Sequence, residues 1–260
     1  MSESTDNGFQ TVAVTRYVTP LREGGSLPGI VEADDLGTYV CKFRGAGQGV
    51  RVLVAEVIVS GLATRLGLRT PRLVALDLDP EIARYEADEE VQDLLNASAG
   101  LNLGIDFLPG AFGYEGEASI PSDEAARVLW LDAFTANVDR TWRNPNLLLW
   151  HGDAWVIDHG AALYFHHAWS TGVTDPARFA AQGWEVGDHV FGSYVDLLPG
   201  VDAELDLTED DLANVVAEVP DDWLEPVLGS ETPDALRAAY VAFLSARLTT
   251  RAWLPGASAA

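Results

Sequence analysis

The segment from Val50 to Leu66 places the strongest constraint on the fold of this chain. Its length and its helix-forming residues predict a helix, and apolar residues occupy nearly every side of that helix. A helix that is apolar all round is stable only where other parts of the protein cover it. We therefore expect this helix to lie buried within a larger fold.

The segments around this helix are of two kinds. Strand composition is found at residues 11–19, 29–32, 38–43, 71–78 and 101–108, and residues 81–95 form a charged helix or a surface excursion. Helical patterns follow at residues 122–137, after Thr208 and at 232–249, with Ser122 expected as an N-cap and Thr208 with Asp211 as a capping box. Strands first and helices afterwards predict an α+β fold. We expect a single domain over residues 1–260, with a β-rich N-lobe at about 11–108 that holds the buried helix and a mainly α-helical C-lobe at about 109–260.

The charge of the chain restricts its partners. The 260 residues include 40 acidic and 16 basic side chains, which gives a net charge of −24. Such a field repels phosphate backbones and anionic lipid surfaces, so we expect neither a nucleic acid nor a membrane as partner. No apolar stretch approaches the roughly 18 residues of a membrane helix, and the one cysteine, Cys41, cannot form an internal disulfide. We expect a cytoplasmic protein, in which a bound nucleotide would need local positive charge.

The most informative stretch surrounds a predicted hairpin. Residues 146–150 and 154–157 form two short apolar strands, and residues 151–153 form the turn between them. Antiparallel pairing then places Asn144 opposite about Asp158, so that two oxygen ligands face one point and could hold Mg²⁺. Asp139 precedes this pair and could accept a proton from an attacking hydroxyl.

The spacing of these residues matches a known catalytic arrangement. An aspartate followed five residues later by asparagine, with an Asp-x-Gly sequence after a hairpin, is the catalytic-loop pattern of protein kinases. The alternative is that Asp139 caps a turn, Asn144 lies in a loop and Asp158 ends a strand. The combination with a hairpin of the right length favours the catalytic interpretation.

Lys42 is the only lysine of the chain, and it lies in the predicted strand at 38–43. Glu56 lies among apolar residues on the following helix, where an unpaired carboxylate would be costly. Pairing with Lys42 would solve this problem and would form the cation clamp that binds nucleotide phosphates in kinases. The alternative places Lys42 on a solvated strand face and pairs Glu56 with Arg51 or Ser60.

Two glycine-bearing loops are candidates for phosphate binding. The turn at residues 22–26 could offer the amides of Gly24, Gly25 and Ser26, although it could equally be a plain hairpin turn. The loop at 45–49 precedes the buried helix and lacks the ending of a Walker motif, so it is a secondary candidate.

These motifs resemble those of the HipA-like kinases, specifically the short stand-alone bacterial group, and more distantly those of the phosphatidylinositol kinases. The resemblance rests on residues 39–49, on Glu56, on the sequence 137–140 with Asn144, and on residues 157–160. It implies a two-lobed protein-kinase-like fold. It also implies ATP-dependent phosphorylation of a serine or threonine of a protein, with Asp139 catalytic, Asn144 and Asp158 on magnesium, and Lys42 on phosphate. From its position alone, the segment containing Ile105 and Phe107 is expected to contact the adenine.

The sequence departs from ordinary protein kinases at two points. His159 stands where they have phenylalanine, and no Ala-Pro-Glu follows. Beyond about Phe165 the chain carries no substrate signature. Two other functions therefore stay open: a nucleotide-binding pseudokinase that acts as a protein-interaction module, and a nucleotidyl transferase on the same fold. The acceptor is an unidentified protein or a small hydroxyl compound.

Overall fold

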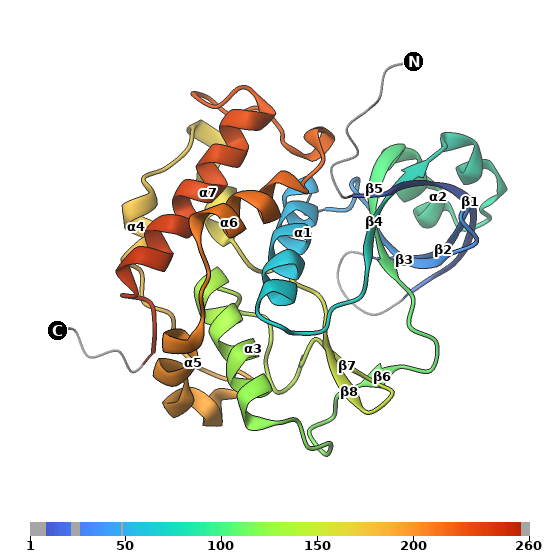
Figure 1. Ribbon diagram of the computed structural model, residues 1–260. Coiled ribbons are helices and arrows are strands. Elements are labelled where there is room, and N and C mark those ends of the chain that lie inside the picture. Colours follow the sequence, from blue (N-terminus) through green and yellow to red (C-terminus); the bar gives the residue numbers. More distant parts are fainter. Residues whose placement is uncertain (1–8, 22–26, 48, 256–260) are drawn as a thin grey trace.

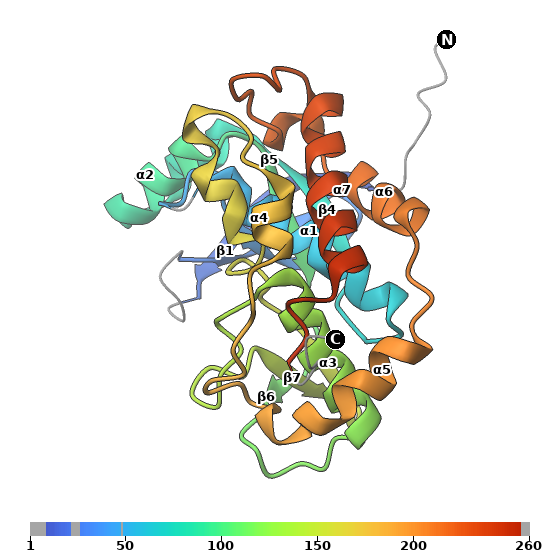
Figure 2. The same ribbon diagram turned by 90° about the vertical axis from the view of Figure 1, so that its left-hand side faces the viewer.

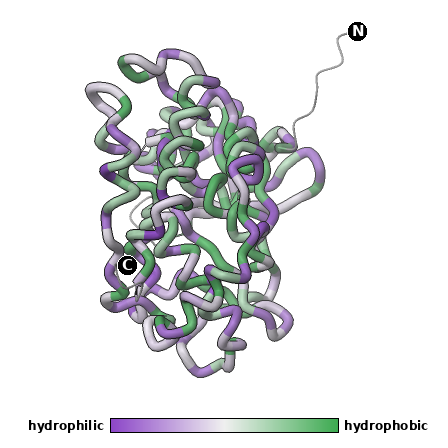
Figure 3. The backbone as a smooth tube through the Cα atoms, turned by 60° about the vertical axis from the view of Figure 1, so that its left-hand side comes forward, coloured by the Kyte–Doolittle hydropathy of each residue, from purple (hydrophilic) through white to green (hydrophobic). Residues whose placement is uncertain are grey.

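The computed structural model describes residues 9–21, 27–47 and 49–255. It has a β-rich N-lobe and a mainly helical C-lobe (Figure 1). The predicted α+β class is thus confirmed. Hydrophobic segments lie mainly inside and hydrophilic segments mark the outer loops (Figure 3).

The N-lobe is built on a closed barrel of five strands in the order β1-β2-β3-β5-β4. Their bounds are β1 Thr11–Pro20, β2 Gly29–Ala33, β3 Thr38–Lys42, β4 Leu73–Leu78 and β5 Gly100–Asp106. The antiparallel meander β1-β2-β3 agrees with the sequence prediction. Parallel pairing of β1 with β4 closes the barrel, and composition and spacing do not predict this long-range contact.

Side chains of the strands alternate between the barrel interior and its outer surface. On β3, Tyr39 and Cys41 belong to the core inside the barrel. Val40 and Lys42 therefore point to the opposite face. A 3₁₀ helix, Pro80–Tyr85, and α2, Glu89–Ala97, contribute apolar side chains to the same barrel core, so the predicted charged segment at 81–95 consists of two short helices.

Helix α1, Val50–Arg65, is the buried helix that the sequence predicts. Eleven of its 16 residues are buried. It lies between the barrel and the helices of the C-lobe (Figure 1). At Gly61 a Cβ atom would lie 2.7 Å from Cγ1 of Val215 in α6, which shows how closely the C-lobe approaches α1. The faces of this apolar helix are thus covered from both lobes.

The C-lobe consists of helices around one small sheet. Its elements are β6 Phe112–Gly113, α3 Ser122–Thr135, β7 Leu147–Trp150, β8 Asp153–Val156, η2 Tyr164–Thr171, α4 Pro176–Ala180, η3 Gly192–Leu197, α5 Leu198–Glu204, α6 Glu209–Ala217, η4 Asp221–Trp223 and α7 Pro233–Thr250. Helices α4 and α7 lie against each other (Figure 2). Within the described residues no helix is long and apolar enough to cross a membrane.

Of the two helix caps that the sequence predicts, one is confirmed and one is wrong. Thr208 and Asp211 form the predicted capping box of α6. At the start of α7, Thr232 accepts a hydrogen bond from the amide of Ala235, the third residue of the helix. The prediction that Ser122 caps α3 is wrong. The amide of Ala125 already donates to the carbonyl of Pro121, so Ser122 is the first helical residue and Pro121 takes the cap position.

The hairpin β7–β8 has the tight turn that its sequence predicts. His151 and Gly152 have φ angles of 53° and 88°, the left-handed pair of a two-residue type I′ turn. Asp153 pairs with Trp150 and belongs to β8, so the turn is one residue shorter than predicted. The pairing continues to Leu147 and Val156, and Asn144 and Asp158 flank this end of the hairpin.

Candidate active site

An ion cluster joins three separate elements at the boundary between the lobes. Lys42, at the end of β3, forms an ion pair with Glu56 of α1. Its Nζ also donates to Oδ1 of Asp158, which follows β8, at 2.7 Å. Glu56 thus binds Lys42. The alternative interpretation, in which Glu56 pairs with Arg51 or Ser60, is wrong. The structure brings together three of the residues that the sequence singled out.

Charge within this cluster sets the protonation of its members. Burial lowers the pKa of Lys42, but the carboxylates of Glu56 and Asp158 outweigh burial and raise it above its ordinary value. For Asp158, burial raises the pKa and Lys42 lowers it, with a net decrease. At neutral pH Lys42 is therefore a cation and Asp158 an anion, as phosphate and metal binding require.

The loop that carries Asp158 lies directly against α1. A Cβ atom at Gly160 would lie 2.5 Å from Cγ1 of Val52 and 3.3 Å from Oε1 of Glu56. Only glycine allows so close an approach between this loop and the helix. The glycine of the Asp-x-Gly sequence thus has a steric role in holding Asp158 near Lys42.

Asp139 lies in a loop stabilised by two asparagines. The side-chain amide of Asn144 donates to Oδ2 of Asp139 at 3.0 Å, and that of Asn146 donates to the same oxygen at 3.3 Å. The amide of Asn144 is oriented by this bond, with its own oxygen directed elsewhere. The structure therefore places the predicted base beside one predicted metal ligand. The sequence did not single out Asn146 as a partner of Asp139.

A buried ion pair between Arg140 and Asp132 of α3 connects this loop to the protein interior. Nε of Arg140 donates to Oδ2 of Asp132 at 2.6 Å, and both side chains are fully buried. Burial raises the pKa of Asp132, but Arg140 and His189 outweigh it and hold the pKa well below its usual range. A buried pair of this kind is strongly destabilised when either partner is removed, because the other charge stays uncompensated.

Arg140 also binds the segments on either side of the hairpin. Its NH1 group donates to the carbonyl oxygens of Asn146 and Ile157, and its NH2 group donates to Nδ1 of His159 at 3.1 Å. One guanidinium thus connects the loop of Asp139 with the loop of Asp158. Sequence analysis missed Asp132, although a carboxylate within the apolar run of α3 could have been found by the reasoning applied to Glu56.

These residues fit a magnesium–nucleotide pair. Mg²⁺ is usually bound by one or two protein oxygens together with substrate phosphates. Asp158 supplies a carboxylate whose side chain is 48% exposed, and Asn144 supplies an exposed amide oxygen. In the described part of the chain, no group of three or more His, Cys, Asp or Glu side chains could hold a metal ion.

The other predicted site residues have different outcomes. Gly24, Gly25 and Ser26 lie outside the described residues. Ile105 is buried on β5, two residues from Leu103, which pairs with Lys42, so Ile105 shares the face of Lys42. Phe107 follows β5 and is 42% exposed.

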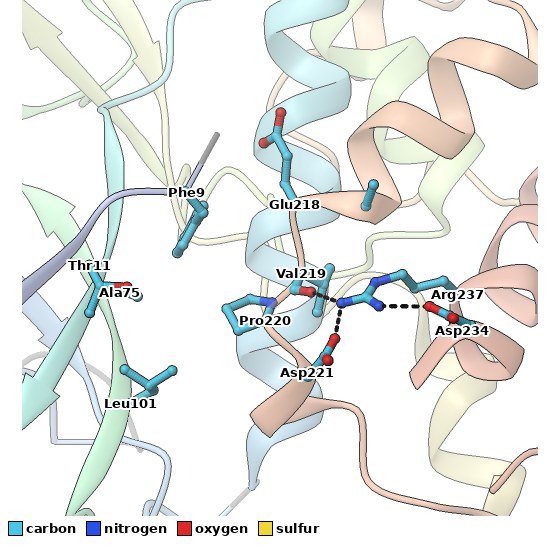
Figure 4. A pocket seen from close by; sticks show the side chains of 11 residues that line it. Phe9, Thr11, Ala75, Leu101, Glu218, Val219, Pro220, Asp221, Asp234 and Arg237 are labelled. Atoms are coloured by element: carbon cyan, nitrogen blue, oxygen red, sulfur yellow. Dashed lines mark hydrogen bonds and ion pairs between the residues drawn. The ribbon is translucent and has the colours of Figure 1, made fainter. Parts of the chain in front are cut away.

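A cavity of about 500 Å³ lies away from these residues (Figure 4). It lies between the barrel, represented by Ala75 and Leu101, and the segment around α6 and α7. Its one cation, Arg237, is already bound to the carbonyl of Val219 and to Asp221 and Asp234. The cavity contains none of the ion-cluster residues, so we do not place the reaction there.

A family model described as HipA-like kinase matches residues 14–243. The chain belongs to the HipA-like kinase family. HipA-like kinases are phosphotransferases, and the resemblance noted from the motifs is confirmed. No curated protein matches the chain.

Two solved structures are similar to this HipA-like kinase. The crystal structure of the Helicobacter pylori proinflammatory kinase CtkA has 10% sequence identity and a TM-score of 0.46, over 93% of this chain and 97% of that one. The crystal structure of the Golgi casein kinase has 12% identity and a TM-score of 0.42, over 92% of this chain and 72% of that one.

Proposed function

We propose that this chain transfers the γ-phosphoryl group of ATP, bound with Mg²⁺, to a serine or threonine hydroxyl of a protein. The observation that carries the proposal is the ion cluster, in which Lys42 binds both Glu56 and Asp158 at the lobe boundary. Such a cluster in a strongly acidic chain provides the local cation that a triphosphate needs.

Each residue has a defined part in this proposal. ATP supplies the transferable group, and Mg²⁺ neutralises charge on its phosphates. Lys42, held by Glu56, binds phosphate, while Asp158 and Asn144 hold the metal. Asp139 accepts the proton of the attacking hydroxyl on a carboxylate oxygen, and its bonds with Asn144 and Asn146 fix the direction of that carboxylate.

The acceptor region next to Asp139 favours a protein substrate. Val138 is 68% exposed and Trp142 is 59% exposed, so two large apolar side chains flank the proposed base. Apolar and aromatic side chains of this kind are enriched at protein contacts. Together with the family resemblance, this supports a protein acceptor over a small polar compound.

Thermal denaturation with and without Mg²⁺–ATP tests the nucleotide site. A ligand that binds only the native state stabilises it by about 2.7 kcal/mol at a hundred times its dissociation constant. We expect a magnesium-dependent rise in Tm for the wild type that is lost in Asp158→Ala. No rise for the wild type at millimolar ATP would contradict the proposal and leave a protein-interaction role.

Mass spectrometry of the modified acceptor tests the reaction. Phosphoryl transfer adds about 80 Da to a target, and nucleotidyl transfer adds about 329 Da. Asp139→Asn should lower the rate by about 10²–10⁴-fold while the Tm rise with Mg²⁺–ATP is kept. Full product formation by Asp139→Asn would show that Asp139 is not the base.

A further inference from the structure

A segment distant in sequence runs along the loop of Asp139. We call residues 184–190 the strap and residues 137–146 the catalytic loop. The amide of Trp142 donates to the carbonyl of Asp188 at 3.0 Å, and the amide of Val190 donates to the carbonyl of Arg140 at 3.2 Å. The indole of Trp184 donates to the carbonyl of Asn137 at 2.9 Å. The strap is thus bonded to both the beginning and the middle of the catalytic loop.

His189 is the strap residue that points inward. Its Nδ1 accepts a hydrogen bond from the amide of Phe191 at 3.0 Å, so the proton of the neutral ring is on Nε2. Nε2 lies 2.9 Å from Oδ2 of Asp132 and donates to it. The imidazole therefore binds the same carboxylate oxygen as Arg140 of the catalytic loop.

Asp132 controls residues on both sides of Asp139. Its Oδ1 accepts from the side-chain amide of Asn137 at 2.8 Å, and its Oδ2 accepts from Arg140. The oxygen of the Asn137 side chain in turn accepts from the backbone amide of Asp139 at 3.1 Å. The orientation of one buried carboxylate thus determines where the backbone of Asp139 lies.

We propose that His189 is a positioning residue for Asp139, acting through Asp132. Its N–H group fixes the rotation of the Asp132 carboxylate, so that Asn137 and Arg140 are held at the same time. The inference rests on the proposed role of Asp139 as base. It gives the strap, a segment without any recognisable motif, a part in catalysis.

Three substitutions separate positioning from simple structural support. His189→Ala removes the N–H donor, His189→Gln can place an amide N–H where Nε2 lies, and His189→Asn is too short to do so. Glu185→Gln changes an exposed residue of the same strap and serves as the matched control. If His189→Ala does not fold, the comparison of the glutamine and asparagine variants carries the test.

Hydrogen exchange of the whole 260-residue chain measures the loop directly. A lost hydrogen bond to a charged group corresponds to roughly a 10–100-fold change in an equilibrium. We expect amides of the catalytic loop to exchange about tenfold or more faster in the alanine and asparagine variants, with near wild-type exchange in His189→Gln and Glu185→Gln. Unchanged loop exchange in His189→Ala and His189→Asn would overturn the inference.

Steady-state kinetics give the second readout. We expect kcat to fall about 10–100-fold in His189→Ala, with a smaller loss of Mg²⁺–ATP affinity, because Lys42 and Asp158 lie outside the catalytic loop and only Asn144 lies within it. Glutamine should restore kcat to within about threefold. Equal loss of kcat in the glutamine and alanine variants would show a structural role. If the wild type transfers no phosphate, the proposed function is wrong, and hydrogen exchange still decides the role of His189.

Discussion

Gly160→Ala tests how tightly the loop of Asp158 is held against α1. The added methyl carbon would lie 2.5 Å from Cγ1 of Val52, a distance that the close-packed interior does not tolerate without a shift of the loop or the helix. Such overpacking costs about 1–3 kcal/mol. For a chain of this length, that corresponds to a decrease in Tm of roughly 2–6 °C.

Combining Gly160→Ala with Val52→Ala tests whether this cost comes from the contact between the new methyl group and the Val52 side chain. Val52→Ala removes the Cγ1 atom that the new methyl meets, so Gly160→Ala should cost less than about 1 kcal/mol in the Val52→Ala background. The double-mutant cycle should then show a coupling energy of about 1–2 kcal/mol. Gly183→Ala is the control, because no heavy atom lies within 4 Å of a Cβ at that position.

Urea unfolding, monitored by tryptophan fluorescence, measures these differences in the free energy of unfolding. The rise in Tm with Mg²⁺–ATP measures nucleotide binding. Nucleotide binding should weaken in Gly160→Ala, because the shift moves Asp158 relative to Lys42. The reasoning is refuted if Gly160→Ala costs the same with and without the Val52 side chain, or no more than Gly183→Ala.

Two further substitutions test the contact of α1 with the C-lobe and the buried histidine. Gly61→Ala should lower the free energy of unfolding measured in urea, because its Cβ would lie 2.7 Å from Cγ1 of Val215. This clash opposes the helix propensity of alanine, which favours alanine over glycine by about 1 kcal/mol. A variant more stable than the wild type would contradict the close contact with Val215. Burial, assisted by Arg140, lowers the pKa of His159 to about 3, against about 6.5 when unfolded. Below about pH 6.5 the unfolded chain therefore binds a proton at His159 that the folded chain does not bind. The free energy of unfolding decreases as the pH falls from about 6.5 towards 3, and the decrease is about 3 kcal/mol at about pH 4. His159→Asn keeps an acceptor for Arg140 and should remove the part of this decrease that comes from His159. If the free energy of unfolding falls equally in the wild type and in His159→Asn between about pH 7 and 4, His159 does not cause the decrease.

Much of the candidate site could be predicted because its residues lie in short, local patterns. The hairpin is defined by a turn whose glycine and preceding residue adopt positive φ, and it places Asn144 and Asp158 at one end. The pair of Glu56 with Lys42 is predictable because a carboxylate on a buried helix needs a cation, and the chain has one lysine. The proposed catalytic and binding roles of these residues stay predictions.

The remainder depends on contacts between residues far apart in the chain. His189 lies 57 residues from Asp132, and a histidine in a loop has no pattern that reveals such a partner. Barrel closure by β1 and β4 is likewise a pairing between segments that are separated by α1. Composition also does not predict the first residue of a helix. At Ser122 the helix already includes the residue expected as its cap, because the carbonyl of Pro121 accepts the first hydrogen bond of the helix.

The burial of α1 from both lobes has a consequence for synthesis of the protein. The indole of Trp223 donates to the carbonyl of Leu101, so η4 reaches the N-lobe, and α6 contacts α1 at Gly61. Both elements leave the ribosome long after α1. At about 5–20 residues per second, roughly 10–30 s pass between synthesis of Arg65 and of Trp223. During that time an apolar helix lacks part of its cover, and exposed apolar surface of this kind makes a nascent chain prone to aggregation until the covering elements are made.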